Sequence, residues 1–241
     1  TGTPRGSMRM TYAAEDDYGV ASAEVKVQPL PPKAGDPATS WARPPPLTGP
    51  RLPLEPPPVL SLKIPRPGAK KVESSTLLEI GEHPWAGQRV RLWLEATDVG
   101  GQVGRSKAIE IVLPARRFKN PLARALIEQR RKLAEDSRNR STVARALDAL
   151  TMEPEGFITD TSVYLGLRAI YHRLDREMSR ETLKESVDEL WQIALKVEDG
   201  NLSQAERALK DAQDQLSNAL QKGDDKEIQD ALAELKKRLN D

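Results

Sequence analysis

The sequence predicts a multi-domain chain in which an immunoglobulin-like or fibronectin-like β-sandwich precedes an all-α helical bundle or array of helical hairpins. Three observations lead to this fold class. Short runs of alternating apolar residues fill residues 1–114, a proline-rich insert interrupts them at residues 29–67, and apolar stripes at helical spacing fill residues 115–241. We therefore place the boundary between the two domains directly after Pro114.

Strand-like runs recur through the first domain and are bounded by turn residues. Residues 90–96 are the clearest example, because their side chains alternate and leave one face apolar and the other mixed. Residues 97–102 contain two adjacent glycines and predict a hairpin. About five to seven short antiparallel strands with a late hairpin are typical of a sandwich. The runs comprise residues 8–13, 20–27, 59–64, 76–80, 90–96 and 108–113.

The insert holds fourteen prolines between Pro29 and Pro67. Because proline lacks a backbone N–H and fixes φ, this stretch favours loop and polyproline II structure over a central strand. A loop that decorates the sandwich is the preferred interpretation, and a Pro-x-x-Pro segment at residues 50–53 that docks in an aromatic groove is the alternative. Trp41 in the insert either anchors back onto its own domain or reaches a partner.

Helices are predicted in the second domain from their apolar stripes and their caps. Asn120 and Pro121 supply an N-cap and a proline at the first helical position, and Ser179 caps a later helix in an imperfect capping box with Thr182. Gly223 separates the last two helices, which we expect to form an antiparallel pair. The predicted helices begin near residues 121, 141, 161, 180, 202 and 224.

Charge is distributed unevenly although the net charge is only +1. Residues 116–145, the basic band, carry ten Lys or Arg side chains and three acids, whereas acids predominate from residue 146 onward. The basic band is either balanced by acids within the fold, the preferred interpretation, or binds an anionic lipid surface or an acidic partner. Nucleic acid is not expected as a partner, because Phe118 is the only aromatic residue in the band.

No residue pattern predicts a catalytic, cofactor or metal site, and we expect no cofactor. The chain has no cysteine and two histidines, which excludes a disulfide framework and leaves too few ligands for a thiolate or histidine metal site. Asp16, Asp17 and Asp98 either stabilise turns, the preferred interpretation, or meet at one end of the sandwich and bind calcium. Glycines near residue 100 are interpreted as hairpin glycines because a strand, not a helix, follows them.

No run of about eighteen apolar residues occurs, so we expect no membrane span within this sequence. The chain begins with Thr1 and shows no signal peptide, which we interpret as a fragment of a longer protein or a processed chain. Any anchor or targeting signal is then expected outside these residues.

Five separated stretches of the chain match a known pattern in order, namely residues 16–20, 96–98, 118–128, 157–173 and 190–203. Together they resemble one family of large inner-membrane proteins of alphaproteobacteria, catalogued as a domain of unknown function. The resemblance implies membrane helices upstream, a periplasmic location for this portion and a low-complexity tail downstream. The family has no assigned catalytic residues to carry over.

These observations favour a non-enzymatic periplasmic scaffold or protein-interaction segment of a membrane-anchored envelope protein, whose partner is an envelope protein or a second copy. The alternative is a carbohydrate- or peptidoglycan-binding module in which Trp41, Trp85 or Trp93 stacks on sugar. A hydrolytic enzyme built from carboxylates is a third hypothesis, which nothing in their spacing supports. The candidate interaction residues are Trp41, Trp85, Trp93, Arg124, Arg130, Arg131 and Trp191.

Overall fold

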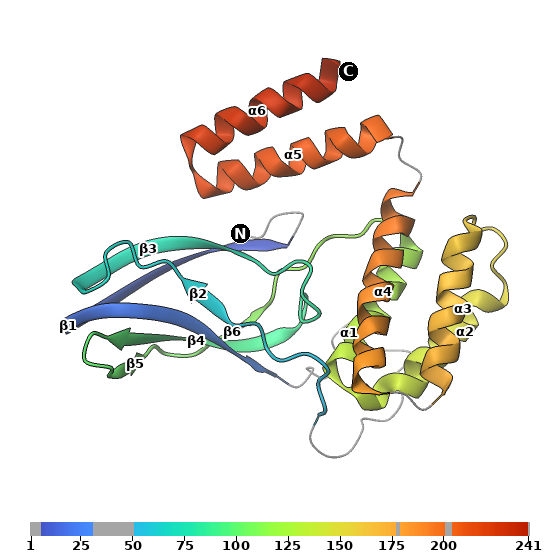
Figure 1. Cartoon of the computed structure of the whole chain (residues 1–241), viewed down its shortest axis with the longest axis horizontal. Coiled ribbons are helices and arrows are strands. Elements are labelled where there is room, and N and C mark those ends of the chain that lie inside the picture. The colour runs from blue at the N-terminus through green and yellow to red at the C-terminus, as the bar shows by residue number, and fades with distance from the viewer. Residues whose placement is uncertain (1–5, 31–50, 177–178, 201–203, 241) are drawn as a thin grey trace. The chain divides into compact units, whose positions relative to one another are not determined.

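The structure, a computed structural model, describes residues 6–30, 51–176, 179–200 and 204–240 (Figure 1). Trp41 lies outside the described residues. The chain divides into two compact units. The sheet unit comprises residues 1–32, 57–117 and 204–241, and the helical unit comprises residues 33–56 and 118–203.

Within the described residues, an antiparallel sheet of six strands precedes six α-helices and one short 3-10 helix. This order confirms the predicted β part followed by an α part, while the immunoglobulin-like sandwich stays a prediction. The strands are β1 (Ser7–Pro29), β2 (Leu60–Leu62), β3 (Ala69–Glu79), β4 (Arg89–Asp98), β5 (Val103–Arg105) and β6 (Ile109–Val112). The helices are α1 (Pro121–Glu135), η2 (Ser137–Asn139), α2 (Arg140–Met152), α3 (Thr161–Asp175), α4 (Arg180–Asp199), α5 (Gln204–Lys222) and α6 (Asp225–Asn240).

Strand β1 joins two runs that the sequence predicted as separate strands. Its first half pairs with β3 and its second half with β2 and β4, and the register shifts between Glu15 and Val20. The chain turns there because the Asp16 carboxylate accepts a hydrogen bond from the Tyr18 amide at 2.8 Å and Gly19 has a φ of +91°. The predicted turn is therefore an irregularity within one long strand.

Strand β4 lies between β1 on one side and both β5 and β6 on the other. The predicted hairpin at residues 97–102 is confirmed, because the Asp98 amide donates to the Gln102 carbonyl at 3.0 Å and β5 follows directly. Between β5 and β6, Ser106 continues the pairing with Leu94 through its own amide and its hydroxyl, both at 2.9 Å. The two short strands thus form one interrupted edge beside β4.

The core of the sheet unit is built from the apolar face of the strands. Val25 on β1 and Val90 and Leu92 on β4 are almost completely buried, and so are Trp85 and Leu113 in the segments that flank β4 and β6. Alternation places charged side chains on the opposite face of β1 and β4. One face of these strands is therefore the core and the other is solvated.

Helices α5 and α6 form the hairpin predicted around Gly223, whose φ is +72° (Figure 1). Asp224 caps α6, since its carboxylate accepts from the Lys226 amide at 2.9 Å. The hairpin buries small side chains, among them Ala212 and Ala231, whereas Leu220 is 58% exposed.

The helical unit packs α1 against α4 and α2 against α3 around one core. Its helices begin where the sequence predicts, because Asn120 accepts hydrogen bonds from the first-turn amides of α1 and Ser179 accepts from the Thr182 amide of α4. Helix α2 ends at Met152, before Pro154, as predicted. Among the described residues, no helix combines the length and the apolar character that crossing a bilayer requires.

Candidate functional site

The end of the proline-rich insert docks on the helical unit. We call Leu52, Pro53, Leu54 and Glu55 the strap; these residues form no helix or strand of their own. Leu54 is 0% exposed and belongs to the helical core. Every other buried residue of that core comes from α1, α2, α3 or α4, so among the described residues the strap supplies the only buried member from outside these helices.

The strap forms hydrogen bonds with backbone groups at the end of α1 that have no partner within the helix. The last carbonyls of a helix have no partner within the helix, and the Ala134 carbonyl near the end of α1 accepts from the Leu54 amide at 3.0 Å. The Ser137 amide, just past the helix, donates to the Leu52 carbonyl at 2.9 Å. The strap is thus hydrogen-bonded along its backbone to the end of α1.

The first two turns of α4 hold the other side of the strap. The Arg180 guanidinium donates to the Pro53 carbonyl at 2.7 Å and to the Leu54 carbonyl at 2.8 Å. One turn later on the same face, Lys184 pairs with Glu55 at 3.0 Å. We call this set of groups at the end of α1 and the start of α4 the clamp; it comprises Ala134, Ser137, Arg180 and Lys184.

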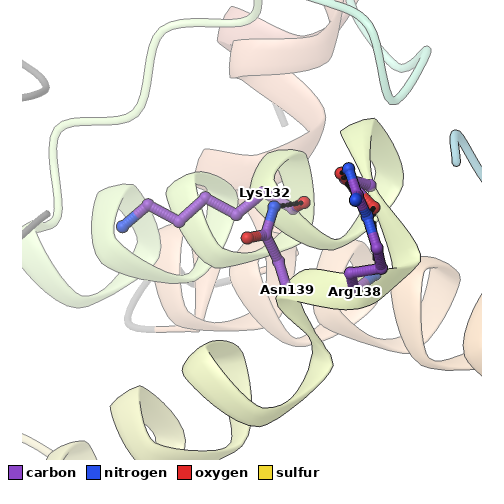
Figure 2. A network of polar contacts seen from close by, with 4 residues as sticks. Lys132, Arg138 and Asn139 are labelled. Carbon is purple, nitrogen blue, oxygen red and sulfur yellow. Dashed lines mark hydrogen bonds and ion pairs between the residues drawn. The ribbon is translucent and has the colours of Figure 1, made fainter. Parts of the chain in front are cut away.

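A polar network holds the chain between α1 and α2, next to Ser137 of the clamp (Figure 2). Asn139 donates to the Lys132 carbonyl at 2.9 Å, and Arg138 binds the Asp136 carboxylate at 2.6 Å. Burial raises the pKa of Asp136, but hydrogen bonds from Arg138 and from the backbone of Leu52 outweigh it and hold this pKa below its ordinary value. The strap therefore also contributes to stabilising the ionised Asp136.

The contacts between the strap and the clamp give only a small net free energy of docking. Burying Leu54 contributes about 2 kcal/mol, and each of the four hydrogen bonds contributes about 1 kcal/mol. The partly exposed ion pair between Glu55 and Lys184 adds less than about 1 kcal/mol. Ordering the four strap residues costs about 1–2 kcal/mol each. Gains and costs agree within a few kcal/mol, so the strap is held without being an irreversible part of the core.

A second candidate surface is the solvated face of the sheet around Trp93. The half-buried Trp93 lies opposite Lys26 on β1, and its indole N–H donates to Glu95 at 2.9 Å. Arg105 pairs with Glu95 at 2.8 Å. The hydrogen bond from Trp93, helped by the nearby cations, lowers the pKa of Glu95, and the hydrogen bond to Glu24 raises the pKa of Lys26. This face combines an aromatic ring with charged hydrogen-bonding groups.

The other predicted tryptophans in the described part of the chain lie in the cores. Trp85 is 2% exposed in the sheet unit, and Trp191 is 6% exposed in the helical unit. The structure brings Trp191 and Arg130 together, with the guanidinium 4.6 Å from the centre of the ring, while Phe118 meets the same ring edge-on at 5.7 Å. Arg130 also donates to the Val187 carbonyl at 3.1 Å, so it connects α1 to α4.

Several side chains of the basic band contact groups of the helical unit. Arg138 binds Asp136, and Arg140 donates to the Leu174 carbonyl at 2.8 Å and to the Arg176 carbonyl. Of the remaining candidates, Arg124 is exposed and Arg131 is half-buried. The band therefore includes internal contacts. Its exposed basic side chains are Arg117 and Lys119, which precede α1, Arg124 on α1 and Arg145 on α2.

Sequence reasoning missed two features. The clamp has no local signal, because Arg180 and Lys184 lie more than a hundred residues from the strap they bind. The second feature is a contact in which the Lys196 ammonium donates to the Ser162 hydroxyl and pairs with Asp160 at 2.9 Å.

Asp160 is the N-cap of α3, and hydrogen bonds from Ser162, followed by Lys196, hold its pKa well below the ordinary range. The lysine donates in this contact, so the group is a helix cap and not a serine activated by a base. Among the described residues, no group of three acidic, histidine or cysteine side chains is placed to hold a metal ion.

Comparison with known proteins identifies a family. The model of DUF4175, described as a domain of unknown function, matches residues 1–241. No curated protein and no solved structure matches the chain significantly. Because the family model covers the full length of the sequence, this chain belongs to the DUF4175 family.

Proposed function

We propose that this chain is a non-enzymatic scaffold or protein-interaction segment of a membrane-anchored envelope protein, located in the periplasm. The single observation that carries the proposal is the clamp, which holds an irregular peptide segment by its backbone, one buried leucine and one carboxylate. The periplasmic location rests on the resemblance to inner-membrane proteins. An envelope protein and a second copy of this chain are the proposed partners.

Recognition of this kind suits a short peptide and places few demands on its sequence. Backbone hydrogen bonds are indifferent to side chains, so specificity comes from the Leu54 position and from the acid opposite Lys184. The proposed ligand is therefore an irregular or extended segment with a leucine followed by Asp or Glu. Proline before the leucine lowers the entropy that such a segment loses on binding.

A labelled peptide with the sequence of residues 50–58 tests this function by fluorescence anisotropy. The Glu55→Lys chain places its own strap lysine against Lys184, so its strap is weakened and the clamp is open to the added peptide. We expect this variant to bind the natural peptide more tightly than the wild-type chain does, because the wild-type strap competes from within the same chain.

The matched control reverses the charge of the clamp. A chain that carries both Glu55→Lys and Lys184→Glu restores attraction to its own strap, and it should bind the natural peptide less tightly than the Glu55→Lys chain. Circular dichroism confirms that each variant is folded. Absence of saturable binding to every folded variant, even at high peptide concentration, would rule out a peptide-binding clamp.

Carbohydrate or peptidoglycan binding on the Trp93 face is a second candidate function. Support comes from the partly exposed ring of Trp93 beside Lys26 and Glu95, a combination that suits stacking and hydrogen bonding to a sugar. A glycan-binding face predicts a saturable change of tryptophan fluorescence with peptidoglycan fragments, lost in Trp93→Ala and kept in Trp85→Phe. A response that is unchanged in Trp93→Ala would exclude this face.

A further inference from the structure

We propose that the strap exchanges between copies, so that the strap of one chain docks in the clamp of a second chain and the exchange is reciprocal. This inference rests on the proposed function, because it names the partner of the same clamp. The occupant is a second copy of this chain, and the contact surface is the clamp together with the pocket that Leu54 fills.

The first argument is chemical fit. The strap forms a hydrogen bond or an ion pair with every residue of the clamp. Its backbone is hydrogen-bonded to the backbone of Ala134 and Ser137. Its carbonyls accept from Arg180, and the Glu55 carboxylate pairs with Lys184. A second copy presents the same four residues and makes the same contacts without any new complementarity. Every copy of the chain carries this segment.

The second argument is that the helical unit does not depend on its own strap for its architecture. The remaining buried core residues all come from α1, α2, α3 and α4, which pack on one another. Departure of the strap uncovers one leucine site, the four groups of the clamp and the Asp136 carboxylate, and it breaks no helix. The clamp therefore persists as a site that a second strap can enter.

The third argument is the way in which the strap is attached. Pro56, Pro57 and Pro58 follow Glu55 directly, and β2 begins at Leu60. Consecutive prolines favour a stiff polyproline II connection, which limits the conformations that the strap loses on docking. Twenty residues separate Leu30 from Arg51 on the other side. A segment that is joined to the sheet unit by irregular chain on both sides is the kind of element that identical chains exchange in domain swapping.

The ion pair between Lys184 and Glu55 gives a direct readout in the unmodified protein. Chains labelled with ¹⁴N and with ¹⁵N are mixed in equal amounts, refolded together and treated with a carbodiimide, which joins an ammonium to a carboxylate that it already contacts. Mass spectrometry of the crosslinked Lys184–Glu55 peptide pair then reports whether the two residues came from one chain or from two. The dimeric fraction is isolated by size-exclusion chromatography after refolding and before the carbodiimide is added.

Reciprocal exchange predicts that about half of the Lys184–Glu55 crosslinks in the dimeric fraction carry mixed isotopes, since pairing of equal amounts is random. The Lys132–Glu128 pair, at 2.8 Å within α1, is the internal control and must give unmixed crosslinks. Leu54→Ala should reduce the dimeric fraction, whereas Leu165→Ala, which removes a 59% exposed leucine, should leave it unchanged.

Two results overturn the inference. Lys184–Glu55 crosslinks that stay unmixed after joint refolding show that each strap returns to its own clamp. Absence of a dimeric fraction in size-exclusion chromatography leads to the same conclusion. If the labelled peptide still binds the Glu55→Lys chain in that case, the peptide-binding function survives and only exchange between copies is excluded. If neither mixed-isotope crosslinks nor peptide binding is observed, both the exchange between copies and the peptide-binding function are excluded.

Discussion

Leu54 occupies a position in the helical core that is otherwise filled from regular helices. Its side chain is fully buried, its amide donates to Ala134, and Arg180 binds its carbonyl. These three attachments hold Leu54 in the helical core. Leu52, two residues earlier, is 51% exposed and anchors only through its backbone.

Leu54→Ala should lower the free energy of unfolding by about 2 kcal/mol, because it removes a buried side chain and weakens the docking of the strap. Leu52→Ala is the matched control and should cost less than about 0.5 kcal/mol, since its side chain is half in solvent. Urea titration followed by circular dichroism compares the two. Equal midpoints for both variants would contradict the burial of Leu54.

Gly19 tests the irregularity in β1. A Cβ at this position would lie 2.2 Å from the Gly68 carbonyl oxygen, and the φ of +91° is unfavourable for other residues. Gly19→Ala should cost about 3 kcal/mol, the sum of backbone strain and overpacking. Gly101→Ala shares the strain, with a φ of +86°, but has no atom within 4 Å of the new methyl group, so it should cost about 1 kcal/mol. Similar losses in denaturant titrations would disprove the close approach to Gly68.

At the scale of elements, the segment between α1 and α2 links helix termination to strap binding. Asp136 caps η2 by accepting from the Arg138 amide at 3.1 Å and also receives the Arg138 guanidinium. Its neighbour Ser137 donates directly to the strap. A change in the charge of Asp136 therefore reaches the clamp through adjacent backbone.

Acid should weaken this segment. The pKa of Asp136 is below its ordinary value of 3.8 in the folded chain, so its contribution to stability is fully present above about pH 4 and is lost as the pH falls through the lowered pKa. Asp136→Asn should remove this part of the acid dependence. Unfolding free energies measured between about pH 5 and pH 2 check the difference, and parallel curves for both proteins would refute the role of this carboxylate.

The sequence predicts the local features of the elements and misses the distant ones. Asn120 and Ser179 were identified as caps because a cap bonds residues two or three positions away. The sequence predicts two strands on either side of Asp16, because a turn within a continuous strand depends on Gly68, which is remote in sequence. Trp85 and Trp191 carry no local sign that they are buried, since burial depends on how the elements pack.

At the scale of the whole chain, the strap is where sequence reasoning departs most from the structure. The sequence of the insert favours a decorating loop, whereas its described end joins the helical core through Leu54. Proline content predicts the absence of regular structure but says nothing about what such a segment contacts. The chain leaves the sheet unit after β1, enters the helical unit with the strap and returns to the sheet unit at β2.

Hydrogen exchange at the Leu54 amide, followed by NMR in the full chain, tests most directly whether the clamp holds the strap. The amide donates to the Ala134 carbonyl at 3.0 Å, so we expect exchange about a hundred-fold slower than in a free peptide of residues 50–58. Arg180→Ala should reduce that protection, because the guanidinium binds the neighbouring carbonyls. Exchange at the rate of the free peptide would contradict the docking of the strap and, with it, the proposed function of the clamp.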